Sequence, residues 1–192
     1  MAIKPILFNT EMVRAILDGR KNCTRRLVKI QPKDNEYTVV FTRKDVQIKT
    51  EKTIAKSPYQ VGDILYVRET WMDYAGRTMY RADCDKYRLE SLKLAEFSWK
   101  PSIHMPKEEA RIWLKVTDVR VERLQEITSE QIGREGVEVE YPHVLNGEEK
   151  RYAFSTLWNS TIKKSDIDRY GWDANPWVWV IEFERCEKPK GV

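Results

Sequence analysis

A short segment near the amino end combines the residue types of a nucleophile and its base. Lys21 and Thr24 stand three residues apart in the sequence GRKNCTRR, which begins at Gly19. Side chains at this spacing point to opposite faces of a strand, but in a turn or bulge they can converge. A partly desolvated lysine among other cations has a lowered pKa and can take the proton of a neighbouring hydroxyl, which activates threonine. The same residues also fit a basic loop in which Thr24 caps a local turn.

A carboxylate in a strand is a second candidate. The stretch 64–71 reads as a strong strand, and its alternation places Glu69 and Trp71 on the face that carries the apolar core residues. An inward carboxylate is costly unless it is paired or used. Glu69 is therefore either the ion-pair partner of Arg26 or Arg68, or a functional group at the mouth of the core.

Glu135 is a third polar candidate, although its sequence context alone fits an exposed position better. It precedes Gly136 at the expected end of a short helix. Other chemistries lack their residues, since His104 and His143 have no partner at metal-ligand spacing and no phosphate-binding glycine loop is present. We therefore expect no metal and no cofactor.

Length and composition favour one folded domain over residues 1–192. The chain has 34 Lys and Arg against 30 Asp and Glu, and the resulting charge of +4 permits an anionic partner without requiring one. Its three cysteines form no Cys-x-x-Cys pair, which is typical of a reduced compartment. No apolar run approaches the ~20 residues of a membrane-spanning helix, and the first residues lack a secretory pattern. We expect a cytoplasmic protein with no membrane contact.

Hydrophobic spacing predicts the elements that must position these groups. Residues 111–121 read as a strand whose inward parity changes partway, so we expect a bulge or bend near Thr117 and Asp118. The other expected elements are a helix that Asn9 or Thr10 caps and Gly19 stops, a hairpin of 37–42 and 46–50, a helix from Ser129 to about Gly136, a helix over 152–163 and a central strand 177–183.

Two polar stretches read as insertions over this core. The first covers about 72–110 and is expected to be irregular, with a short strand at 78–82, and the second covers about 137–150. Short strands of mixed length around a few helices favour an α+β fold, with a small closed, mixed β-barrel and flanking short helices.

Four motifs in order resemble one known family. They are GRKxxTxR at 19–26, YxVGDxLxVRETW at 59–71, EG at 135–136 and WVWVIEF at 177–183. Together they resemble the ASCH domain family, whose members have PUA-like β-barrels, and the resemblance spans nearly the whole chain. The segment WDANP at 172–176 is similar to longer members that are common in phages and prophages.

The resemblance implies an activity and its residues. Members of the family are small amidohydrolases that remove the acetyl group from 4-acetylcytidine with a Lys, a Thr and a Glu. These correspond here to Lys21, Thr24 and Glu135. In one route Lys21 takes the Thr24 proton, Thr24 attacks the acyl carbonyl and Glu135 returns a proton to the leaving amine. In the other, Glu135 activates water while Lys21 and Thr24 polarise the carbonyl.

Four further residues are expected to bind the substrate. Arg26 would steady the oxyanion, Trp71 would stack on the base, Glu69 would accept from its amine edge, and Arg68 lies beside them in the same motif. The expected partner is thus a modified cytidine nucleoside or RNA.

Two other functions remain open from the sequence. The first is an RNA-binding module of PUA-like type, with or without ribonuclease activity, for which the basic loop and the aromatic residues are suited. The second is a phage accessory factor that acts through protein contacts. RNA affinity that survives loss of Lys21 would favour the first over catalysis.

Overall fold

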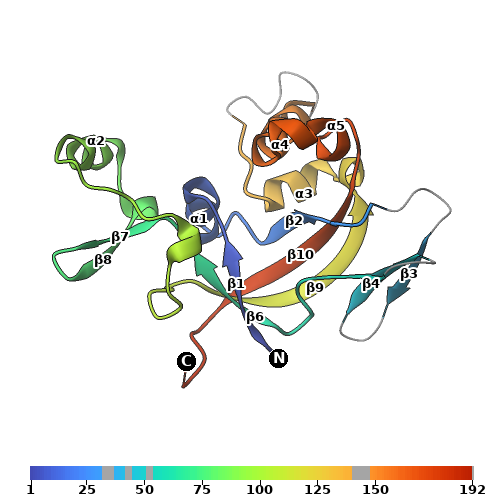
Figure 1. The fold of residues 1–192 in the computed structure, drawn as a ribbon, viewed down its shortest axis with the longest axis horizontal. Helices are drawn as coiled ribbons and strands as arrows, with labels where there is room; N and C mark the ends of the chain where they lie inside the picture. Colours follow the sequence, from blue (N-terminus) through green and yellow to red (C-terminus); the bar gives the residue numbers. More distant parts are fainter. Residues whose placement is uncertain (32–36, 42–44, 51–53, 140–147, 192) are drawn as a thin grey trace.

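The structure is a computed structural model that describes residues 1–31, 37–41, 45–50, 54–139 and 148–191. A strongly curved sheet of five strands runs through its centre (Figure 1). Helices lie against this sheet, and two smaller groups of strands project from it.

The central sheet is mixed, with the strand order β1-β6-β9-β10-β2. β1 pairs with β6 in parallel, and the other three pairings are antiparallel. β10 lies between β9 and β2 and is buried over most of its length, which confirms the central strand expected there. The bounds are β1 Ile3–Leu7, β2 Cys23–Leu27, β6 Ile64–Arg68, β9 Trp113–Arg123 and β10 Trp177–Cys186.

Curvature brings the two edge strands of this sheet together. The backbone pairings of the described residues leave β1 and β2 at the ends of the sheet. The guanidinium of Arg26 on β2 spans the gap and donates a hydrogen bond of 2.8 Å to the carbonyl oxygen of Leu7 on β1. A barrel would close between β1 and β2, and among the described residues it is a side chain, not backbone pairing, that links these two strands. The expected α+β class is confirmed.

A bulge in β9 corrects the direction of its side chains. Asp118 lies opposite Glu182 while Val116 lies opposite Phe183, which leaves Thr117 as the extra residue. Because of this insertion, Val116 and Val119 both belong to the core that contains Phe183. The bulge expected near Thr117 is confirmed.

Helix α1 (Thr10–Leu17) follows β1 as expected. The side chain of Asn9 caps it by accepting the amide hydrogen of Met12 at 2.8 Å. The helix buries Val13, Ala15 and Ile16 against the sheet. It ends before Gly19, whose φ of +75° places it in the left-handed region that ends many helices.

Helix α3 (Ser129–Arg134) begins at Ser129, the residue that the sequence favours as its cap, and Thr128 caps it instead. Thr128, and not Ser129, accepts the amide hydrogen of Gln131, while the Gln131 side chain accepts that of Thr128. This reciprocal pair of bonds explains why Thr128 takes the capping position. α4 (Glu148–Thr161) packs beside α3 and starts before the expected residue 152, and α5 (Ile167–Tyr170) follows it.

Helices α3 and α4 cover a second apolar core on the far side of β10. This core contains Cys23, Ile132, Phe154 and Val180, whereas α1 packs in the first core with Phe8 and Phe183. Within the described part of the chain, no helix combines the length and the apolar character that crossing a membrane requires.

The hairpin at 37–50 is confirmed, with β3 (Tyr37–Phe41) and β4 (Val46–Thr50) joined by β5 (Ile54–Lys56) in a small sheet. Residues 42–44, which include the last residue of the expected first strand and most of the connection to the second, lie outside the described residues. Most of the insertion expected at 137–150 also lies outside them, because residues 140–147 are not described.

The first insertion is more regular than expected. β7 (Trp71–Tyr74) and β8 (Arg77–Tyr80) form a hairpin, and α2 (Lys86–Leu94) follows after a single 3-10 turn (Arg81–Asp83). The strand expected at 78–82 is present as β8, but it ends at Tyr80 because the 3-10 turn begins at Arg81. The strand expected to run to Trp71 ends at Arg68, since the two residues after Arg68 separate β6 from β7.

The N-terminal strand is tied to β6 by one carboxylate, which gives a first testable prediction. Asp63 accepts the amide hydrogens of Ala2 and Gln60 and pairs with Lys4 at 2.7 Å. Burial raises the pKa of Asp63, but these bonds outweigh it and the net pKa lies below its ordinary value. A depressed pKa in the folded state means that the stabilisation is present above pH ~3.9 and is lost as the pH falls further.

We expect Asp63→Asn to lower the free energy of unfolding by about 1–3 kcal/mol at neutral pH, because hydrogen bonds to a charged group are lost. Urea titrations of both proteins between pH 7 and pH 2 should show a gap that narrows below about pH 4. A gap that stays constant down to pH 2 would contradict this role.

Candidate active site

The end of helix α1 places Lys21. After the left-handed residue Gly19, the amide hydrogens of Arg20 and Lys21 both bond to the carbonyl oxygen of Ala15 at 2.9 Å. The backbone of Lys21 then forms an isolated antiparallel bridge with Glu135. The main chain of Lys21 is thus fixed between the helix end and the segment after α3.

The end of helix α3 places Glu135. Its amide hydrogen bonds to the carbonyl oxygen of Gln131, and the next residue, Gly136, has a φ of +83°. A Cβ atom at Gly136 would lie 2.7 Å from that of Ala15 and 3.1 Å from that of Lys21. Only glycine permits this approach, which explains the Glu-Gly pair in the sequence.

Lys21 and Glu135 meet although 114 positions separate them. The Nζ atom of Lys21 donates to Oε2 of Glu135 at 2.7 Å, to the carbonyl oxygen of Glu135 at 2.9 Å and to that of Cys23 at 2.7 Å. The Lys21 side chain is 0% exposed and that of Glu135 is 5% exposed. The three bonds use every donor of the ammonium group.

Arg25 holds the second oxygen of the same carboxylate, and sequence reasoning missed this. Its Nη1 donates to Oε1 of Glu135 at 3.2 Å, and its Nη2 donates to Glu122 and Gln131 at 3.1 Å each. Strand parity carries the signal, because Arg25 shares a face of β2 with Cys23, whose core α3 covers. The sequence alone did not show which carboxylates Arg25 would contact.

Thr24 and Arg26 have the opposite parity on β2. Thr24 is 1% exposed and pairs with Ile181 of β10. Arg26 lies 5.3 Å from the centre of the Phe8 ring, and Nζ of Lys21 lies 5.5 Å from that ring. Among the described residues, no hydrogen bond joins the Thr24 hydroxyl to Lys21 or Glu135. The structure thus brings Lys21 and Glu135 into direct contact and leaves Thr24 on the adjoining strand.

Burial shifts the pKa values of two further groups near the pair. It raises the pKa of the Cys23 thiol to about 12, with a further contribution from Glu135, so the thiol stays protonated and is a poor nucleophile. It also lowers the pKa of the Arg26 guanidinium, against the opposing effects of Tyr59 and Glu135.

Glu69 has a different partner from the ones expected. It forms a two-pronged ion pair with Arg111, with distances of 2.9 and 3.1 Å, and makes no ion pair with Arg26 or Arg68. Burial raises the pKa of Glu69 above its ordinary value despite the attraction of Arg111. Arg111 also pairs with Asp83 at 2.7 Å, so the cluster fastens the first insertion to the sheet.

The side chains of Arg68 and Trp71 have contacts other than the Lys21–Glu135 pair. Arg68 donates to the carbonyl oxygen of Ile103 at 3.1 Å and stacks over Tyr66. Trp71 packs in the core cluster of Tyr66, not with the inward residues of β6, because the strand ends before it. No hydrogen bond or ion pair in the described chain joins Glu69, Arg68 or Trp71 to Lys21, and their role in base recognition stays a prediction.

A network of charges extends from Arg25 along the sheet. Glu122, which Arg25 contacts, also pairs with Arg120, and Glu182 pairs with both Arg120 and Arg134. Burial raises the pKa of Glu182, but the bonds from Arg134 and Arg120 outweigh it, and the net pKa is lowered. Among the described residues, no cluster of three or more His, Cys, Asp or Glu side chains could hold a metal ion.

No family model and no curated protein matches the sequence. Among solved structures, the chain is similar to a crystal structure of an ASCH domain from Lactobacillus crispatus JV V101. The two share 11% sequence identity over 96% of this chain and 79% of that chain, with a TM-score of 0.40.

The close approach at Gly136 gives a prediction about stability. We expect Gly136→Ala to lower the free energy of unfolding by about 2–4 kcal/mol, because overpacking against Ala15 adds to the strain of a left-handed alanine. Thermal and urea unfolding would measure the change.

Two glycines provide matched controls. Gly62 has a φ of +87° with open space around it, so Gly62→Ala should show only the backbone strain. Gly133 lies within α3 and also has open space, so Gly133→Ala should be neutral or slightly stabilising. If Gly136→Ala were no more harmful than Gly62→Ala, the packing argument would fail.

Proposed function

We propose that this protein hydrolyses the acyl group of N4-acylated cytosine nucleosides such as 4-acetylcytidine. The observation that supports the proposal is the buried contact of 2.7 Å between Lys21 and Glu135, two of the three residues that the sequence motifs associate with this activity. A cation and a carboxylate held together in a dry site supply charge stabilisation and proton transfer, which are the two requirements of amide hydrolysis.

The bonding of Lys21 favours one of the two routes. An ammonium group has three donors and no lone pair, and all three are donated to protein acceptors. Lys21 is therefore suited to stabilise negative charge and not to take a proton from Thr24. Glu135, whose oxygens each retain a lone pair, is the better base.

In the favoured route Glu135 takes a proton from water while the water oxygen attacks the acyl carbon. The resulting oxyanion is stabilised by the ammonium of Lys21 and by a hydrogen bond from Thr24. The carbon–nitrogen bond then breaks as Glu135 returns the proton to the exocyclic nitrogen, which yields the free cytosine amine and a carboxylic acid. Arg25 is a positioning residue, since it holds the second oxygen of Glu135.

Substrate access requires an exchange of hydrogen bonds. Because the pair is buried, an acyl oxygen reaches Nζ of Lys21 by replacing the main-chain oxygen of Cys23 or Glu135. Arg26 is only half-buried and lies beside Phe8, on the face of β2 that carries Thr24. This face is the side from which we expect the substrate to enter.

The purified protein should convert 4-acetylcytidine to cytidine, which the change in ultraviolet absorbance measures. We expect Lys21→Met and Glu135→Gln each to lower kcat/KM by about 10²-fold or more, the range of positioned acid–base catalysis. Lys115→Met and Glu184→Gln remove an exposed ion pair of 3.3 Å elsewhere on the sheet and should leave the rate unchanged. Thermal unfolding of each variant would verify that it folds.

Three outcomes would count against parts of this proposal. A folded wild-type protein that releases no cytidine would overturn the activity, and full activity of either site variant would overturn the assigned pair. Mass spectrometry of the quenched reaction separates the routes, because an acetyl group on Thr24 would show that threonine, and not water, attacks.

A further inference from the structure

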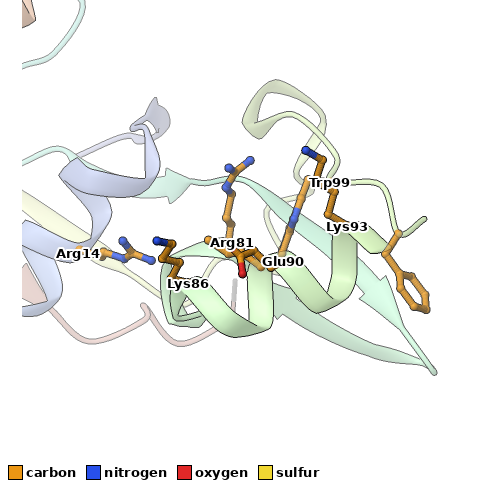
Figure 2. Close-up of a pocket in the computed structure, with 8 residues that line it drawn as sticks. Arg14, Arg81, Lys86, Glu90, Lys93 and Trp99 are labelled. Atoms are coloured by element: carbon orange, nitrogen blue, oxygen red, sulfur yellow. The ribbon is translucent and has the colours of Figure 1, made fainter. Parts of the chain in front are cut away.

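A basic cleft lies in the first insertion, apart from the Lys21–Glu135 pair. It forms between α1, α2 and the 3-10 turn before α2, and has a volume of about 400 Å³ (Figure 2). This volume lies within the usual range for ligand sites. The residues that line it are Arg14, Arg81, Lys86, Leu89, Glu90, Lys93, Phe97 and Trp99.

Three of the cations in this cleft are unpaired within the part of the chain that the structure describes. The side chains of Arg81, Lys86 and Lys93 are exposed, and none forms an ion pair or hydrogen bond with any residue that the structure describes. This contrasts with the central sheet, where Lys115 and Arg120 of β9 pair with carboxylates. Unpaired positive charges along one cleft attract an anionic ligand.

Arg14 has a different role, because its bonds build the wall of the cleft. Its guanidinium donates to the carbonyl oxygens of Ala82 at 3.0 Å and Cys84 at 2.7 Å, and pairs with Glu11. These bonds fasten α1 to the segment that carries Arg81 and Lys86. The main chain next to these two cations is therefore held against α1, while Lys93 lies further along α2.

Aromatic rings lie at the other end of the cleft. The Trp99 indole, drawn beside Lys93 in Figure 2, packs against a small buried cluster that includes Leu92 and Cys84. Phe97 is 42% exposed and contacts the ring of Tyr74. Anchored aromatic rings next to phosphate-binding cations are the combination that binds single-stranded nucleic acid, since bases stack while the backbone follows the charges.

We propose that this cleft binds a short stretch of single-stranded nucleic acid. Phosphates would contact Arg81, Lys86 and Lys93, and a base would stack on Trp99. The one carboxylate of the cleft, Glu90, can accept a hydrogen bond from an exocyclic amine of a base, whereas it would repel an acidic peptide. The proposal does not depend on the deacylation reaction, because none of these residues contacts Lys21 or Glu135.

Fluorescence anisotropy of a labelled single-stranded RNA of about ten nucleotides tests the proposal. We expect the triple variant Arg81→Gln, Lys86→Gln, Lys93→Gln to bind about tenfold or more weakly. The slope of log K against log salt should fall in magnitude by about 2, since each phosphate contact to a single strand contributes about 0.7. Trp99→Leu should weaken binding about fivefold or more through lost stacking.

The matched control removes three exposed lysines outside the cleft, Lys49, Lys163 and Lys188, and so makes the same change in net charge. It should bind nearly as well as the wild-type protein. Glu135→Gln should also retain binding, so failure of the deacylation proposal and failure of this one are distinguishable. Because the substituted cations are exposed, the triple variant is expected to fold normally.

Three results would overturn the inference. The first is the absence of measurable RNA binding by the wild-type protein. The second is an equal loss in the cleft variant and the control variant, which would indicate attraction by net charge alone. The third is competition by inorganic phosphate or duplex RNA as effective as that of unlabelled single strand, which would indicate a simple anion site.

Discussion

The carboxylate of Glu135 is held between the ammonium of Lys21 and the guanidinium of Arg25, in a region that water barely reaches. Removing ions from water costs several kcal/mol each, and an ion pair offsets this only with good geometry and further hydrogen bonds. Lys21 meets that condition by donating to three oxygens. The surrounding elements must therefore deliver main-chain oxygens as well as the opposite charge.

This requirement accounts for the way in which three distant segments converge. Helix α1 must end where Lys21 can enter, β2 must begin at Cys23 with its carbonyl turned to Nζ, and α3 must end at Glu135. The remaining orientation comes from Gly136, which lets the end of α3 approach Ala15 more closely than any side chain would allow. A buried ionic contact thus constrains two helix ends and a strand at once.

Elements of secondary structure with local sequence signals were predicted correctly, whereas side-chain partners at distant positions were missed. The Asn9 cap, the Thr117 bulge and the central strand β10 follow from spacing and parity within a few residues, and all three are present. The partner of Glu69 was wrongly expected to be Arg26 or Arg68, because Arg111 lies 42 positions away and nothing local points to it. Trp71 was placed on the wrong face since alternation shows the parity of a strand but not where the strand stops.

The candidate site shows the same difference between what local sequence patterns predict and what only the tertiary structure reveals. Lys21 and Glu135 were expected together only from the motifs of a family, not from spacing, and their contact is present. Arg25 lies in the basic segment that begins at Gly19, and its role emerges only when β2 and α3 are placed face to face. A residue's charge can be read from the sequence, whereas the charge that opposes it depends on tertiary structure.

Helix α1 contacts two regions in which charges are arranged differently, since they are buried and compensated in one and exposed to solvent in the other. On one side Ala15 packs against Gly136 beside a pair in which every charge is compensated, and on the other Arg14 fixes a cleft whose cations are open to solvent. Compensated buried charges have little long-range attraction but are strongly oriented, which suits chemistry on a small group. Open cations attract at a distance and discriminate weakly, which suits capture of a polyanion. Because neighbouring residues of one helix serve both, the insertion is held in a fixed relation to the buried pair.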